Sequence, residues 1–168
     1  MAHFAEINNT DNVVVRVIVI DNDVVNANGG DLSTEAENYS ASLFPENPNT
    51  YWKQTSYNNN FRANYADCQG GVYRPAEDVF VSAKPSLYPS WVLKTDSWRW
   101  LPPIEYPGSS RPNGASEDVW TCIWNEELWN SSGNTNGWTS MLASDIDNPD
   151  TTRYYLDQAT MTWSLIND

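Results

Sequence analysis

The sequence is poor in the residue types on which most catalytic and metal-binding sites depend. Its 168 residues include one histidine, His3, and two cysteines, Cys68 and Cys122. One histidine cannot supply the base or ligand sets of triads and most metal sites, and neither cysteine has a His or Cys neighbour at ligand spacing. Phosphate-binding loops, dinucleotide fingerprints and zinc motifs are also absent. We therefore expect a non-enzymatic protein without a metal or cofactor.

Basic residues and long apolar runs are scarce as well. Nine Lys and Arg stand against 22 Asp and Glu, which gives a formal net charge of −13. Such a chain repels phosphate backbones and anionic lipid headgroups, so we expect neither nucleic-acid nor membrane binding. The longest apolar-rich run, residues 13–20, contains Arg16 and is shorter than the roughly 18 residues of a membrane span. The N-terminal residues lack the basic and apolar regions of a signal peptide. We therefore expect a protein that is made in a cytoplasm and stays there or leaves by lysis.

Aromatic residues are what the chain has in excess. There are nine Trp, nine Tyr and four Phe. We weigh three roles for the Trp rings: filling the core of a small sheet, stacking on sugar faces, and anchoring a protein–protein interface. A domain of this size cannot bury all of them, so we expect several exposed rings, with Trp100 and Trp138 foremost.

The first third of the chain predicts a small antiparallel sheet with one short helix. An Asn/Asp-rich turn at residues 8–12 separates two strand-like runs, of which residues 13–20 are apolar enough to be a central strand. Residues 33–44 have capping-box spacing and helical periodicity, and this is the one helix that we predict. Residues 50–57 alternate as a strand does.

The rest of the chain predicts a series of β-hairpin units, so that the fold class is mainly β. The paired runs are residues 72–74 with 79–81, 91–93 with 98–100, 120–124 with 128–129, and 154–156 with 161–163. Aromatic residues seven or eight positions apart are expected to meet across three of these hairpins; the pairs are Tyr73 with Phe80, Trp91 with Trp98, and Tyr155 with Trp163. We divide the chain into a core unit (1–107), a Pro/Gly/Ser linker (108–116) and a Trp-rich hairpin unit (117–168).

Acidic residues offer two weaker hypotheses. Residues 21–23 and 145–150 could hold Ca²⁺, but Val25 and Pro149 stand where an EF-hand needs a further oxygen ligand, so we interpret both as solvated turns. The many acidic residues also leave open the hypothesis that two of them form a glycosidase-like carboxylate pair. However, Glu77, Asp78, Glu126 and Glu127 lie in predicted turns, where acids are common for conformational reasons.

Several short motifs follow one another along the chain: Ala2-His3-Phe4-Ala5, Val17-Ile18-Val19, Trp52-Lys53-Gln54-Thr55-Ser56-Tyr57-Asn58, Arg62 with Asn64-Tyr65-Ala66, and Lys84-Pro85 with Ser90-Trp91-Val92-Leu93. Taken together, they resemble a family of small virion-associated proteins of tailed phages that infect marine bacteria, cyanophages among them. The resemblance covers about residues 1–107 and 152–166. Residues 108–150 look like an insertion, and Cys68 departs from the family pattern.

The resemblance implies a structural role on a virion, with no catalytic residues carried over. We expect a capsid decoration or cement protein that binds the major capsid protein or another virion protein through aromatic-rich β elements. The candidate contact residues are Trp52, Tyr57, Arg62, Tyr65, Trp100, Trp120, Trp124, Trp129 and Trp138. The alternatives are a tail or baseplate component with a glycan-contacting face, a cytoplasmic phage protein outside the particle and, more weakly, a glycan hydrolase. Self-association on the particle also stays open.

Overall fold

The chain folds mainly into β-structure, as predicted. A computed structural model describes residues 1–112, 114–115, 118–148 and 150–166. Within these residues lie 11 strands in antiparallel sheets and three short α-helices. Two compact units form: Met1–Lys84 with Leu93–Trp100, and Pro85–Val92 with Leu101–Asp168. None of the described helices is long and apolar enough to span a bilayer.

The first unit is built on a three-stranded sheet with the order β2-β1-β3. The strands are β1 (Ala2–Asn8), β2 (Val14–Ile20) and β3 (Thr50–Thr55). Phe4 of β1 lies opposite Ile18 on one side and Gln54 on the other. The prediction that residues 13–20 form a central strand is therefore wrong. β2 is an edge strand with Val15 and Val19 exposed, because β3 returns to the far side of β1.

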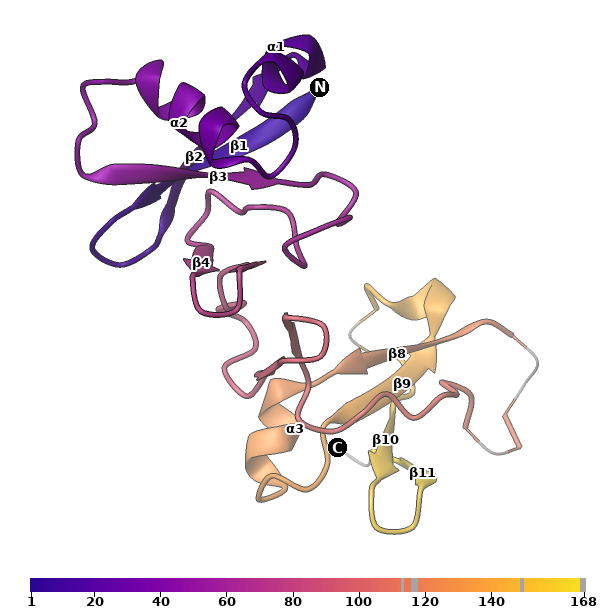
Figure 1. The fold of residues 1–168 in the computed structure, drawn as a ribbon. Helices are drawn as coiled ribbons and strands as arrows, with labels where there is room; N and C mark the ends of the chain where they lie inside the picture. Colours follow the sequence, from indigo (N-terminus) through magenta and orange to yellow (C-terminus); the bar gives the residue numbers. More distant parts are fainter. Residues whose placement is uncertain (113, 116–117, 149, 167–168) are drawn as a thin grey trace. The chain divides into compact units, whose positions relative to one another are not determined.

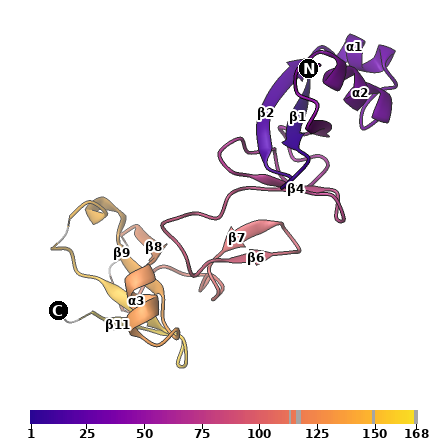
Figure 2. The same ribbon diagram turned by 90° about the vertical axis from the view of Figure 1, so that its left-hand side faces the viewer.

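Both faces of this sheet are covered, which explains why β1 is almost wholly buried. Two helices, α1 (Asn22–Ala27) and α2 (Thr34–Ser42), lie on one face (Figures 1 and 2). That core contains Phe4 and Trp52 with Val25 and Ala36 from the two helices. The alternate residues of β1 pack into a second core against the segment that follows β3; its buried members are Ala5, Ile7, Val14, Ala66, Tyr73 and Phe80.

The predicted helix at residues 33–44 is confirmed, but it is not alone. Ser33 caps α2, because its hydroxyl accepts a hydrogen bond from the Ala36 amide at 3.1 Å. Residues 21–23, expected as a solvated turn, begin α1 instead. The Asp21 carboxylate accepts from the Asp23 amide and caps that helix.

Two hairpins follow in the middle of the chain. The first pairs β4 (Val72–Arg74) with β5 (Val79–Val81), and the Tyr73 and Phe80 rings meet at 5.0 Å as predicted. The second pairs β6 (Val92–Lys94) with β7 (Arg99–Leu101), one residue later than expected (Figure 2). The expected pair of Trp91 and Trp98 therefore lies outside the strands. Trp91 stacks on Tyr88 at 4.5 Å.

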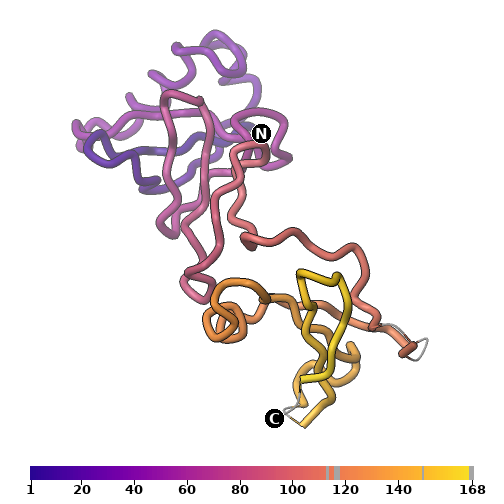
Figure 3. The backbone as a smooth tube through the Cα atoms, turned by 90° about the horizontal axis from the view of Figure 1, so that it is seen from below, coloured from indigo at the N-terminus to yellow at the C-terminus, as the bar shows by residue number. Residues whose placement is uncertain are grey.

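The second unit contains a four-stranded sheet with the order β11-β10-β9-β8. Its strands are β8 (Trp120–Trp124), β9 (Trp138–Leu142), β10 (Tyr154–Asp157) and β11 (Thr162–Leu165), and the 3-10 turn η1 (Ala143–Asp145) follows β9. The predicted C-terminal hairpin is confirmed and is the yellow loop of Figure 3. Its register places Trp163 opposite Leu156, so the expected pairing of Trp163 with Tyr155 is wrong.

The predicted hairpin of residues 120–124 with 128–129 is also wrong. The second run belongs to a helix, α3 (Glu126–Ser131), and β8 pairs with β9 instead. Asn125 caps α3 by accepting from the Leu128 amide at 2.8 Å, and two glutamates occupy the first helical turn. An N-cap Asn followed by acids stabilises a helix start, and this local signal outweighs the aromatic spacing.

The division of the chain differs from the expected boundary at residues 108–116. Tyr88, Trp91 and Ile104 were assigned to the core unit, but they pack on the buried cluster of Trp124, Trp138 and Leu156 in the second unit. The proline-rich segments on both sides of the β6–β7 hairpin thus belong with the C-terminal strands.

Candidate binding surface

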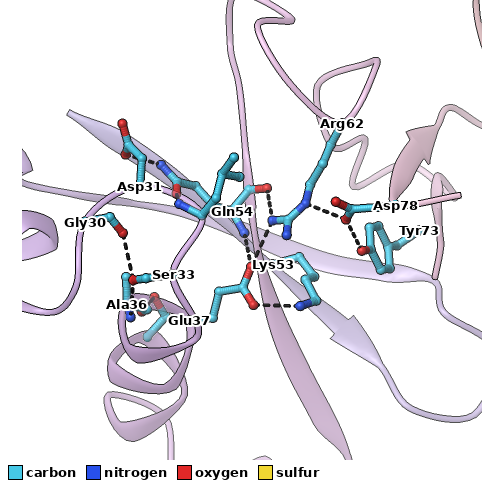
Figure 4. Close-up of polar contacts among 12 residues, drawn as sticks. Gly30, Asp31, Ser33, Ala36, Glu37, Lys53, Gln54, Arg62, Tyr73 and Asp78 are labelled. Atoms are coloured by element: carbon cyan, nitrogen blue, oxygen red, sulfur yellow. Dashed lines mark hydrogen bonds and ion pairs between the residues drawn. The ribbon is translucent and has the colours of Figure 1, made fainter. Parts of the chain in front are cut away.

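A buried ion-pair network organises the first unit, and three of its members, Lys53, Gln54 and Arg62, come from the motifs of the family resemblance. Glu37 of α2 is only 5 % exposed. Its carboxylate lies 2.7 Å from Lys53 Nζ and 2.9 Å from an Arg62 guanidinium nitrogen (Figure 4). It also accepts a hydrogen bond from the backbone amide of Gln54. A buried carboxylate held by two cations is fully compensated. Glu37 therefore joins the helix to β3 and to the loop beyond it.

Arg62 is an internal residue and not a free contact residue. Its Nε donates to Asp78 at 2.6 Å and another guanidinium nitrogen donates to the Gln54 carbonyl at 2.8 Å. Burial lowers the pKa of Arg62, but the hydrogen bonds and charges of Glu37 and Asp78 outweigh it and raise the pKa. Asp78 also accepts from the Tyr73 hydroxyl, and burial together with this bond raises the pKa of Tyr73.

Three further motif side chains hold neighbouring segments in place: Gln54 holds the loop before α2, and Thr55 and Asn64 hold the segment after β3. Gln54 accepts from the Leu32 amide and donates to Asp31. Thr55 accepts from the Ala66 amide at 2.9 Å, and Asn64 donates to the carbonyls of Phe80 and Trp98. Lys53, Gln54, Thr55, Arg62 and Asn64 of the motifs are therefore bonded within the fold.

What the motif leaves at the surface is an aromatic cluster of His3, Tyr57 and Tyr65, which we call the aromatic trio. Tyr57 is 71 % exposed. Its ring stacks on His3 at 6.0 Å and meets Tyr65 edge-on at 5.7 Å, while His3 and Tyr65 lie 5.5 Å apart. Contacts with the other two rings restrain Tyr57, although most of its surface is exposed.

An open hollow of about 420 Å³ lies beside the aromatic trio. His3 and Tyr57 line it, together with polar residues from α1, the loop before α2, β3 and the segment after β3; these polar residues are Asn22, Asp31, Gln54, Thr55, Ser56, Asn58 and Asn60. Nothing in the sequence pattern predicts that His3 and Asn22 lie near Tyr57, because the pairing of β1 with β3 places His3 there and the position of α1 places Asn22 there.

Three of the predicted contact tryptophans are core residues. Trp52 is 4 % exposed and stacks on Phe44 at 5.3 Å. Trp124 and Trp138 are 6 % and 8 % exposed and meet edge-on at 5.5 Å. The Trp138 indole donates to the carbonyls of Ile104 and Glu105, so the expectation that Trp138 is exposed is wrong. Gly137 allows this packing, because a Cβ there would overlap the Trp124 ring.

The other three tryptophans of the predicted set are half-buried. Trp100 donates to the Ser82 carbonyl at 2.9 Å and has the Lys84 ammonium over its ring. Trp120 meets Tyr154 edge-on at 5.7 Å, and Trp129 lies 5.3 Å from Trp124. Each ring is oriented by a neighbour and keeps part of its surface accessible.

The two cysteine thiols and the buried carboxylate of Glu6 lie outside this surface, and each has its own environment. Burial raises the pKa of the Cys122 thiol to about 12, while the pKa of the exposed Cys68 is raised by burial and by the charge of Asp67. The buried Glu6 carboxylate accepts from Arg16, Asn47 and Thr50. Among the described residues, no group of three or more His, Cys, Asp and Glu side chains is placed to hold a metal ion.

Comparison of the chain with known protein families, curated proteins and solved structures finds no match.

Proposed function

We propose that this chain is an accessory structural protein of a phage particle, foremost a decoration protein on the capsid, and not an enzyme. The resemblance of its motifs to small virion proteins is the starting point. Its acidic character supports binding to protein rather than to nucleic acid, because a net charge of −13 opposes contact with phosphates.

The internal network of the first unit supports a structural role. Lys53, Gln54 and Arg62 are motif residues, and all three are bonded within the fold. They account for a stable scaffold without any reacting group.

The partly accessible rings of Trp120 and Trp129 are the observation on which the docking surface rests. Trp120 begins the edge strand β8, Trp129 lies in α3, which follows β8, and Ile123 of β8 is also exposed. A half-buried Trp held by neighbouring rings loses little side-chain entropy on binding, which is typical of interface hot spots. A decoration protein contacts many identical subunits, so modest contacts of this kind are sufficient.

The test is quantitative mass spectrometry of purified particles of the phage that encodes the chain. A copy number that scales with the major capsid protein supports the proposal. A copy number typical of a tail ring moves the chain to the tail, and absence from the particle contradicts a virion role.

A contact test uses Trp120→Ala, with Met161→Ala on an exposed turn of the same unit as the matched control. Loss of a hot-spot ring weakens binding to particles that lack the protein by roughly tenfold or more. The control variant should bind as the wild type does. Circular dichroism on both variants separates lost contact from lost fold.

A second candidate is a tail or baseplate component with a glycan-contacting face. The observation that favours it is the hollow beside Tyr57, where an exposed ring and polar side chains lie together. Binding of the purified chain to host polysaccharide, together with a low copy number, would favour this candidate.

A further inference from the structure

We propose that the hollow beside the aromatic trio binds a neutral saccharide, with the Tyr57 ring as the stacking surface and neighbouring side-chain amides as hydrogen-bond partners. This inference takes up the glycan-contacting face of the second candidate and names its residues and ligand class. A decoration protein and a tail protein can both carry such a site, so it does not depend on the position of the chain in the particle.

The exposed ring is the first requirement of a sugar site. One face of a pyranose carries a row of C–H groups, and their slight positive charge matches the negative face of an aromatic ring. Tyr57 has the accessible surface for this contact, and its contacts with His3 and Tyr65 hold it in place. A restrained ring loses little entropy when a ligand binds.

The polar lining supplies the second requirement. Asn22, Asn58 and Asn60 are exposed, and their side-chain amides make no hydrogen bond with the described residues. An amide offers two donors and an acceptor, which suits pairs of adjacent hydroxyls that both donate and accept. The Gln54 amide, in contrast, is bonded to Leu32 and Asp31 and forms part of the wall.

Charge restricts the class of sugar. The lining residues include Asp31 but no Lys or Arg. The Asp31 carboxylate and the net charge of −13 oppose a phosphate, sulfate or uronate here, and no Lys or Arg side chain lines the hollow to offset them. Neutral hexoses and their polymers do not meet this penalty.

The size of the hollow agrees with a small ligand and not with a protein face. Its volume of about 420 Å³ lies within the range of about 300–1,000 Å³ that is usual for small-molecule sites. Polar groups predominate in its lining, whereas a docking groove for a peptide or protein presents mainly apolar surface.

The test is calorimetric and NMR titration of the full chain, tagged at the C-terminus because Met1 and Ala2 also line the hollow. The probes are a soluble β-glucan, a mannan and a galactan with their monosaccharides, and a sulfated polysaccharide as the charged probe. We expect saturable binding of at least one neutral probe and none of the charged one. Tyr57→Ala should weaken binding about tenfold or more, Tyr57→Trp should retain it, and Asn58→Ala should weaken it.

Tyr106→Ala is the matched control, because Tyr106 is an exposed tyrosine of the second unit. Binding of no neutral probe, or binding that Tyr57→Ala leaves unchanged, overturns the inference. The inference is also overturned if Tyr57→Ala reduces attachment to particles while sugar binding is unchanged, or if it does so and the wild type binds no sugar. In both cases the aromatic trio is a protein contact. Presence in the particle is measured separately, so the virion proposal and the saccharide site can fail independently.

Discussion

At the scale of single residues, several polar side chains of the motifs have structural partners within the fold. Arg62 shows this most clearly, because its guanidinium is bonded to Glu37, Asp78 and the Gln54 carbonyl and its side chain is only 7 % exposed. Arg62 also adopts a left-handed backbone conformation, with φ of 55°. The network holds this residue in a conformation that non-glycine residues adopt at a cost.

We expect Glu37→Gln to destabilise the first unit by about 2–4 kcal/mol, because it leaves two cations short of a buried counter-charge. Urea denaturation followed by far-UV circular dichroism measures the change. Glu77→Gln is the matched control, since the exposed pair of Glu77 with Arg74 is surrounded by solvent and its loss should not be measurable. Equal stability of the two variants would show that the buried network does not stabilise the fold.

At the scale of elements, three hairpins share one kind of turn. The residue just before the second strand has a positive φ in each: Asp78 at 53°, Trp98 at 55° and Met161 at 55°. Glycine is the residue that usually occupies this conformation, and none of the three positions has it. At Asp78 the strained position places a carboxylate beside Arg62 and Tyr73. At Met161 the side chain is exposed, so little compensates the strain.

Met161→Gly should therefore stabilise the second unit by about 0.5–1 kcal/mol, because glycine adopts the left-handed conformation without strain. Ala159→Gly in the same turn should have the opposite sign and a similar size, since Ala159 does not have a positive φ and glycine there only increases the entropy of the unfolded chain. Thermal unfolding of the two variants beside the wild type checks the pair. A loss of stability in both would contradict the strain at residue 161.

At the scale of the whole molecule, the chain has separate cores in its two units. The sheet of the first unit is packed on both faces by Phe4, Trp52, Tyr73 and Phe80 with their neighbours. The second unit is organised around Trp124, Trp138 and Leu156. Because each unit buries its own apolar cluster, we expect them to unfold as distinct cooperative blocks.

Trp138→Ala tests this expectation. Removal of a buried indole that also donates to two carbonyls should cost the second unit about 3–5 kcal/mol. Native-state hydrogen exchange should then show faster exchange of the β8 and β9 amides, with the protection of the β1 amides unchanged. Equal acceleration in both strands would show that the two units unfold together.

Local chemistry explains which predictions succeeded. The helix at residues 33–44, the first hairpin, the strand at residues 50–55 and the pairing of Tyr73 with Phe80 all depend on neighbours close in sequence. The capping box expected from the spacing of Thr34 and Glu37 is wrong, because Ser33 caps the helix and Glu37 pairs with Lys53 and Arg62. The helix at Glu126–Ser131 was missed although its N-cap signal is present, because the aromatic spacing was given more weight than the Asn-Glu-Glu start.

The candidate site could be predicted only in part. Tyr57 and Tyr65 were among the predicted contact residues, and they are the ones that the fold brings together at the surface with His3. His3 itself, and the amides of Asn22 and Asn58, carry no sequence signal for such a site. They meet through the pairing of β1 with β3 and the position of α1.

The sequence by itself determined the mainly β class, the acidic surface and the excess of aromatic rings, since composition and alternation express these directly. Only the tertiary structure decided which rings are buried. Trp52, Trp124 and Trp138 became core residues, while Tyr57 stayed at the surface. The physical reason is that an aromatic side chain satisfies the same sequence pattern in a core and in a binding surface. Burial depends on which distant segments cover it, and that depends on strand order and not on neighbours in the chain.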